Sequence, residues 1–211
     1  MKEKILKIVP AYGVIPVLAV FAFNLITYYG TKIIDIGRLT HDVSIGLDSQ
    51  IPLLTPFMLI YLLAFVEWVI GYVMIARDSV KLCYWYIPAE LIAKFICLVI
   101  FIVYPTAMAR PEVAADGFFN WMTSIVYYVD TPTDLFPSIH VLESYLIARA
   151  SLDMEKVGKD YKIFVWVFFA LVAVGVLFVK QHLVLDVLAG IVVAEIGIVI
   201  SRKLKLWTRR S

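Results

Sequence analysis

Six stretches of the chain are almost entirely apolar, and polar residues gather between them. A helix needs roughly 20 mainly apolar residues to cross a bilayer, and the six stretches reach or approach that length. We therefore predict six membrane-spanning helices. Their expected ranges are about 8–30, 53–76, 85–104, 137–152, 161–180 and 183–201. The fourth stretch is the shortest, and the pattern marks its ends least sharply.

The composition also indicates a membrane protein. Apolar residues make up 62% of the 211 residues and the mean hydropathy is +0.89, whereas an average chain has about 45–50% apolar residues. The length fits one domain, so we expect a single all-α transmembrane domain over residues 1–211. The net charge is only +2, and basic residues flank the spans instead of forming a stripe, so nucleic-acid binding is not expected.

The first apolar stretch follows a basic N-terminus, "MKEKILK", which is also how a secretory signal begins. This stretch is longer than the apolar core of a signal, and it has no clear small-x-small cleavage site before Asn24. We therefore interpret it as a retained first span.

Positive residues predict the orientation of the chain. With six spans, both termini share one face with the 77–84 and 152–160 connections, and this face holds fourteen of the 19 Lys and Arg residues. The opposite face holds four, and the remaining one, Lys94, lies inside the third span. Cytoplasmic segments carry the excess of Lys and Arg, so we predict a multi-pass protein of the cell membrane with cytoplasmic termini.

The same topology gathers six polar residues at the extracytoplasmic surface. The third span leaves the membrane near Tyr104, the fourth begins at Pro137, and the fifth and sixth meet near His182. Six residues with polar or ionisable side chains are expected at this depth: Arg110, Ser138, His140, Lys180, His182 and Asp186.

These side chains are suited to phosphoryl transfer. His182 and Asp186 are four residues apart and share a face in a helix, and a carboxylate bonded to one imidazole nitrogen leaves the other free to attack. His140 adds a second imidazole that can protonate a leaving group near neutral pH. Ser138 lies at a helix start, where anions bind readily, and Arg110 can hold phosphate oxygens. The set predicts a site that needs no metal and no other cofactor.

Each residue also has a structural interpretation. Ser138 can simply cap a helix, and Asp186 can do the same for the sixth span. Arg110 and Lys180 can anchor the protein at the membrane interface. A lone histidine in a membrane protein often pairs helices, but the joint order, spacing and depth of these residues favour a site.

Three motifs carry a family resemblance. The segments "YPTAMARP" (104–111), "PSIH" (137–140) and "KQHLVLDVLAG" (180–190) resemble, in order, the three signature blocks of the type 2 phosphatidic acid phosphatase superfamily. The resemblance covers roughly residues 48–190, because "LDSQIPLLTP" is similar to the branch containing the inositol phosphorylceramide and sphingomyelin synthases.

The resemblance implies a role for each site residue. His182 would be the nucleophile that forms a phosphohistidine, and Asp186 would orient it. His140 would protonate the leaving group and later activate water. Arg110 would bind the phosphate oxygens, helped by Ser138 and its backbone amide.

The chain departs from the family pattern at several positions. The lysine expected seven residues before Arg110 is Val103, and the glycine of the second block is Ile139. The Ser-Arg pair of the third block is Gly175-Val176 (positions 175–176). Two phosphate-binding cations of the pattern are therefore absent. We expect Lys180 to replace one of them, and we expect a monophosphate to suit the site better than a diphosphate.

The function implied is hydrolysis of a lipid phosphate monoester or diphosphate at the extracytoplasmic surface. Two alternatives stay open: transfer of a phosphorylated lipid headgroup to another alcohol, and a non-catalytic lipid-binding or transport relative, which the missing cations favour. We favour hydrolysis because the chain is short and has no dedicated acceptor element. The sequence specifies neither the lipid nor the oligomeric state.

Other polar and aromatic residues call for an interpretation as well. Unpaired charge inside a membrane is costly, so we predict that Glu67 and Lys94, which lie at similar depths, form an ion pair. Glu143 shares a face with His140, and it either tunes that imidazole, lines the substrate path or pairs with another helix. The segment 117–130 holds five aromatic residues and predicts a short helix on the outer surface, or a lid over the site.

Overall fold

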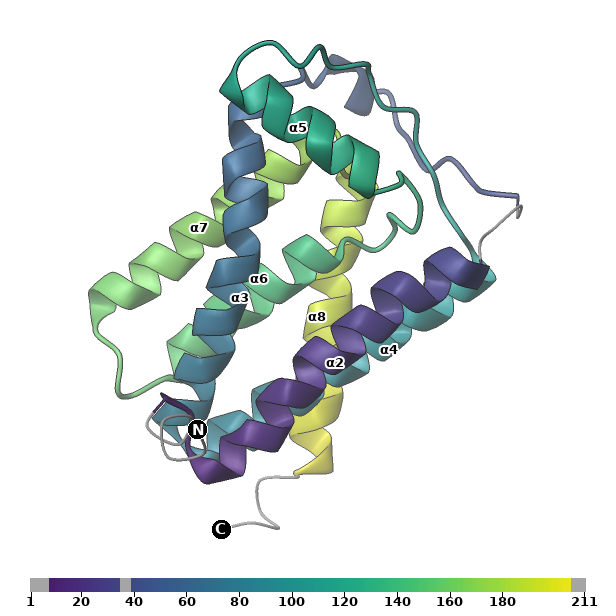
Figure 1. The fold of residues 1–211 in the computed structure, drawn as a ribbon. Coiled ribbons are helices and arrows are strands. Elements are labelled where there is room, and N and C mark those ends of the chain that lie inside the picture. The colour runs from purple at the N-terminus through teal and green to yellow at the C-terminus, as the bar shows by residue number, and fades with distance from the viewer. Residues whose placement is uncertain (1–7, 35–38, 206–211) are drawn as a thin grey trace.

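The computed structural model describes residues 8–34 and 39–205 (Figure 1). These residues contain no β-strand, only two isolated β-bridges, which confirms the predicted all-α class. The helices are α2 (Ala11–Ile34), α3 (Met58–Asp78), α4 (Val80–Val103), α5 (Phe118–Val129), α6 (Ile139–Asp153), α7 (Lys159–Phe178) and α8 (Val184–Leu204), with 3₁₀ turns η1 (Asp48–Gln50) and η2 (Thr55–Phe57).

Five segments of the described chain are long and apolar enough to cross a membrane, and they indicate a multi-pass membrane protein. They are Ala11–Ile34, Thr55–Asp78, Val80–Val103, Lys159–Phe178 and Val184–Leu204. They correspond to the first, second, third, fifth and sixth predicted spans. α4 begins at Val80, earlier than predicted, because the Ser79 side chain accepts a hydrogen bond from Leu82 N and caps the helix there.

The fourth predicted span is α6, and it differs from the other five. Its 15 residues extend about 22 Å at 1.5 Å per residue, whereas the hydrocarbon core of a bilayer is about 30 Å thick. Ten of the 15 are buried, because α6 packs against α3, α4, α7 and α8. In Figure 1 it lies in the middle of the bundle. The apolar run at 137–152 therefore reflects a helix enclosed by protein.

The connections between helices gather at two ends of the bundle (Figure 1). At one end, the carboxylate of Asp78 accepts hydrogen bonds from the backbone N–H groups of Glu155 and Lys156, which joins the α3–α4 junction to the α6–α7 loop. At the other end lie α5, the start of α6 and the turn between α7 and α8. The predicted site residues belong to this second end.

The helix α5 corresponds to the aromatic segment predicted to form a short surface helix, and that helix is confirmed. It lies across the end of the bundle in Figure 1. The Thr55 hydroxyl donates to the Asn120 side chain at 2.6 Å, and the Tyr127 hydroxyl donates to the Val179 carbonyl at 2.8 Å. These bonds attach α5 to η2 and to the end of α7.

Close packing of α8 depends on two glycines. A Cβ atom at Gly197 would lie 2.3 Å from the carbonyl oxygen of Ala89 on α4. A Cβ atom at Gly190 would lie 2.6 Å from the carbonyl oxygen of Ser138, which precedes α6. Small residues let helix backbones approach in membranes. Gly190 therefore sets the separation between the starts of α6 and α8, which carry most of the predicted site.

Replacing Gly190 with alanine is expected to push these two helix starts apart. The added methyl group would meet backbone atoms, which cannot rotate away, so we expect a loss of about 1–3 kcal/mol in stability. Thermal unfolding in detergent, followed by circular dichroism, measures it. Gly30→Ala is the matched control, because Gly30 is also helical and a Cβ there meets nothing within 4 Å. Equal stability of the two variants would contradict the close contact.

The predicted Glu67–Lys94 ion pair is wrong. Lys94 Nζ lies 2.6 Å from Glu90 Oε1 and 2.5 Å from Glu143 Oε1, and all three side chains are buried. Glu67 instead accepts a hydrogen bond from the Ser144 hydroxyl at 3.0 Å. Of the interpretations of Glu143, pairing with another helix is the one observed. The two residues were expected at similar depths in the membrane, but depth does not determine the direction in which a side chain points around its helix.

Candidate active site

A tight turn between α7 and α8 positions His182. The backbone N–H groups of Gln181 and His182 both donate to the Val176 carbonyl, at 2.9 and 3.1 Å. Lys180 adopts a left-handed conformation with φ of 49°, and the chain reverses within a few residues. His182 precedes Leu183, the N-cap of α8. It therefore lies in the turn where the fifth and sixth spans were predicted to meet, just before the helix that carries Asp186.

The His182 ring is held through one nitrogen. Its Nδ1 lies 3.0 Å from the Leu135 carbonyl oxygen and 3.4 Å from Asp186 Oδ2. Because a carbonyl can only accept, Nδ1 is the donor, and in the neutral form of the ring the lone pair is then on Nε2. Asp186 Oδ2 also accepts a hydrogen bond from Leu183 N at 2.7 Å. The predicted contact with Asp186 is present, and the carbonyl of Leu135 is a closer partner that the sequence did not indicate.

Ser138 is the N-cap of α6 and is fully buried. Its hydroxyl accepts a hydrogen bond from Val141 N at 3.4 Å, and its own N–H donates to the Asp186 carbonyl at 3.0 Å. The structural interpretation of Ser138 is thus observed. The first backbone N–H groups of a helix have no partner inside it. The N–H groups at the start of α6, after Ser138, are therefore hydrogen-bond donors beside the Ser138 hydroxyl.

His140, in the first turn of α6, lies in an aromatic pocket. Its ring stacks on Tyr61 with centroids 4.1 Å apart, and Phe65 and Trp68 lie at 5.2 and 4.9 Å. The residue is 9% exposed, and Nε2 has no hydrogen-bond partner among the described residues. Tyr61 to Trp68 lie roughly 5 to 15 Å from the first residue of α3 at 1.5 Å per residue. His140 is therefore recessed below the end of the bundle.

The two imidazoles face one cavity. The ring centroids of His140 and His182 are 6.1 Å apart, and both rings line a cavity of about 530 Å³. Its lining is largely apolar, and its exposed residues come mainly from α2, α3 and the end of α5. Leu25 and Tyr29 belong to α2, Phe65 and Val69 belong to α3, and Val129 is the last residue of α5. The mouth of the cavity is therefore bordered by two apolar spans and by the end of α5.

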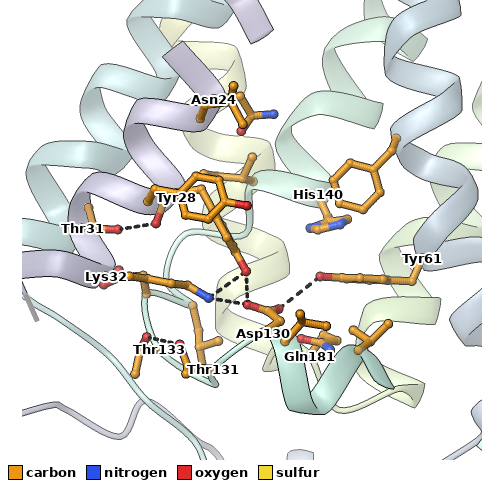
Figure 2. A pocket seen from close by; sticks show the side chains of 18 of the residues that line it. Asn24, Tyr28, Thr31, Lys32, Tyr61, Asp130, Thr131, Thr133, His140 and Gln181 are labelled. Atoms are coloured by element: carbon orange, nitrogen blue, oxygen red, sulfur yellow. Dashed lines mark hydrogen bonds and ion pairs between the residues drawn. The ribbon is translucent and has the colours of Figure 1, made fainter. Parts of the chain in front are cut away.

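The side of the cavity opposite His140 is polar (Figure 2). Asp130, which follows α5, accepts hydrogen bonds from Lys32 Nζ and the Tyr28 hydroxyl, both at 2.6 Å, and from the Tyr61 hydroxyl at 3.5 Å. Arg110 Nη2 lies 3.8 Å from the same carboxylate. The sequence analysis did not identify Lys32 or Asp130 as site residues. The one indication in the sequence was that Tyr28 and Lys32 are four residues apart at the end of the first span and so share a helix face.

The carboxyl group of Asp130 is ionised in this environment. Burial by itself raises the pKa of Asp130, but hydrogen bonds from Lys32 and Tyr28 and the charges of Lys32 and Arg110 outweigh it. The pKa is therefore lowered from its usual value. One ionised carboxylate thus holds two cations from distant parts of the chain.

Arg110 reaches the site through protein acceptors. Its Nη1 donates to the Asp130 carbonyl at 2.6 Å, and its Nη2 donates to the Gln181 side chain. The guanidinium carbon lies 4.9 Å from the centre of the Tyr127 ring. Arg110 is therefore adjacent to the residue before His182, as the predicted topology requires. Its side chain is only 6% exposed and does not belong to the cavity lining.

Lys180 is attached to the segment before α3. Its Nζ donates to the carbonyls of Ile51 and Asp48, at 2.5 and 3.1 Å. The Asp48 carboxylate in turn accepts a hydrogen bond from Val184 N at 2.8 Å at the start of α8. Lys180 also lines, with His182, a second cavity of about 490 Å³. Its ammonium group thus stabilises the 48–51 segment against the α7–α8 turn.

Within residues 8–34 and 39–205, no three His, Cys, Asp or Glu side chains are grouped so that they could hold a metal ion. No protein-family model, curated protein or solved structure matches the chain. The chemistry of the cavity itself is therefore what indicates a function.

Proposed function

We propose that this protein is a membrane lipid phosphatase that hydrolyses a phosphate monoester or diphosphate through a phosphohistidine on His182. The observation that carries the proposal is the pair of imidazoles at one apolar cavity. His182 is held through Nδ1, and His140 has a buried Nε2 with no hydrogen-bond partner among the described residues. This is the arrangement of an oriented nucleophile beside an acid–base partner.

The reaction has two displacement steps. In the first, the lone pair of His182 Nε2 attacks phosphorus, the bond from phosphorus to the lipid oxygen breaks, and its electron pair goes to that oxygen. Protonated His140 gives its proton to the leaving oxygen. The negative charge of the arriving phosphate favours this protonated state.

In the second step, neutral His140 takes a proton from water as the water oxygen attacks phosphorus. The phosphorus–nitrogen bond breaks, inorganic phosphate leaves, and the His182 lone pair is restored. Asp186 and the Leu135 carbonyl hold the His182 ring in one orientation through both steps.

The shape of the cavity supports a lipid as the substrate. Its volume of about 530 Å³ lies within the range of about 300–1,000 Å³ that is usual for small-molecule sites. The mouth is bordered by α2, α3 and the end of α5, and the exposed lining residues of α2 and α3 are apolar or aromatic. A headgroup can therefore enter sideways while the acyl chains stay in the bilayer, and α5 lies where it can act as a lid.

The proposal includes the orientation of the chain. Six passes, with α6 as the short enclosed one, place both termini in the cytoplasm and the site on the extracytoplasmic side of the cell membrane. The face that carries the termini holds fourteen Lys and Arg residues, and the face that carries the site holds four. This excess supports the orientation. The α7–α8 turn and the start of α6 lie together at the end away from the α3–α4 junction, which agrees with it.

Phosphate release tests the proposal. Purified protein in mixed micelles with EDTA is given phosphatidic acid, lysophosphatidic acid, phosphatidylglycerophosphate or a prenyl diphosphate, each in parallel with His182→Ala. We expect the wild-type protein to release phosphate from at least one substrate and His182→Ala to release none. Absence of release from all four would reject hydrolysis. A labelled headgroup passed to an added lipid alcohol would assign the transferase reaction instead.

A further inference from the structure

We propose that Lys32, and not Lys180, is the lysine that binds the anionic group of the substrate, and that Asp130 is its counter-ion while the cavity is empty. This inference rests on the proposed function for the identity of the substrate. It assigns the first helix a part in the site that none of the sequence motifs indicated.

Lys32 is the cation that faces the cavity. It is the only Lys or Arg among the described residues of the lining, and its side chain is 19% exposed. It lies across the cavity from His140 in Figure 2, so an anion between them would contact both. Two acidic residues, Asp130 and Asp134, also belong to the lining. An anion is therefore attracted only if a cation in the same lining offsets them.

The two cations predicted from the sequence have other partners. Lys180 Nζ donates to the carbonyls of Ile51 and Asp48, so moving it to a phosphate would leave those two carbonyls without a donor. Arg110 uses its Nη atoms on the Asp130 carbonyl and the Gln181 side chain. By contrast, the chief acceptor of Lys32 is another charged group that a phosphate can replace.

Asp130 is suited to this exchange because its carboxylate lies near two cations, Lys32 and Arg110. Its carboxylate lies 2.6 Å from Lys32 Nζ and 3.8 Å from Arg110 Nη2. A phosphate offers more oxygen acceptors and more negative charge than a carboxylate, so it forms stronger charge-assisted hydrogen bonds. The long, flexible side chain of lysine lets the ammonium group turn from Asp130 toward the phosphate while the helix stays in place.

Binding of dodecyl phosphate tests the inference without turnover. The parent protein is the full chain with His182→Ala, titrated calorimetrically in a nonionic detergent, with inorganic phosphate as a second probe. Lys32→Met and Lys32→Gln remove the charge, and Lys32→Arg keeps it. Lys180→Met tests the competing lysine. Lys203→Met is the matched control, because Lys203 is exposed near the end of α8, at the other end of the bundle.

We expect both neutral variants of Lys32 to bind dodecyl phosphate at least about tenfold more weakly than the parent, which corresponds to 1.4 kcal/mol. Lys32→Arg and Lys203→Met should stay within about threefold of the parent. Inorganic phosphate bound with the same dependence on Lys32 would show that the phosphate alone is recognised. Binding of dodecyl phosphate only would show that the lipid chain is required, and both results support the assignment.

Three results would overturn the inference. These are parent-like affinity in both neutral variants of Lys32, a loss confined to Lys180→Met, and failure of the parent to bind either probe. The proposed function fails separately: a wild-type protein that shows Lys32-dependent binding but releases no phosphate would reject hydrolysis and leave the role of Lys32 intact.

Discussion

Replacing His182 with glutamine is expected to lower the rate of phosphate release by at least about 10³-fold, because the covalent step loses its nucleophile. The glutamine amide can still donate a hydrogen bond toward the Leu135 carbonyl, so the turn before α8 keeps a donor there. The amide nitrogen has no lone pair free to attack phosphorus. The loss should therefore appear in kcat, with little change in thermal stability.

Rapid chemical quench with ³²P-labelled phosphatidic acid measures the covalent step directly. Wild-type protein should carry acid-labile label during turnover, as a phosphorus–nitrogen bond requires, and His182→Gln should carry none. His41→Gln is the matched control, since His41 is exposed and lies outside the cavity lining. Label on the His182→Gln protein would mean that another residue is the nucleophile.

The His140→Asn variant separates the two histidines in the same experiment. With an aryl phosphate, whose leaving oxygen needs no added proton, this variant should form the labelled protein at a rate near that of wild type. It should then lose the label slowly, because the base that activates water is gone. Rapid loss of label would assign the base to another group.

The long spans of this fold could be predicted because a bilayer sets a minimum length of apolar chain. α3, α4, α7 and α8 fall close to their predicted ranges. α6 was harder to interpret, because a helix buried among other helices is apolar without facing lipid. Its 15 residues resemble a short span in the sequence, and only the packing against four neighbours distinguishes the two cases.

The candidate site was predictable in part for the same reason. Span ends placed Ser138, His140, His182 and Asp186 at one depth, and they lie close together: both histidines line the cavity, and the buried Ser138 and Asp186 lie behind them. The Lys32–Asp130 contact joins residues nearly a hundred positions apart, and it depends on how α2 lies against the loop after α5. Hydrophobic patterning carries no information about such a contact.

The buried ion cluster illustrates the same limit and yields the largest expected change in stability. Lys94 lies between the carboxylates of Glu90 and Glu143, with its side chain 0% exposed. Glu143 also accepts hydrogen bonds from the Tyr72 hydroxyl and from the Asn24 side chain. The cluster thus connects α2, α3, α4 and α6 at the centre of the bundle.

Lys94→Met is expected to destabilise the protein by about 3–5 kcal/mol, because it leaves two buried carboxylates without their cation. Unfolding in detergent, followed by tryptophan fluorescence, measures the change against Lys203→Met, which removes an exposed lysine. The double variant Lys94→Met with Glu90→Gln should recover part of the loss. It removes one of the two carboxyl groups that have lost Lys94 and leaves the other with Tyr72 and Asn24 as donors. If Lys94→Met were as stable as Lys203→Met, the cluster would not be an ionised one, and its charges would not stabilise the packing of α6 against α4.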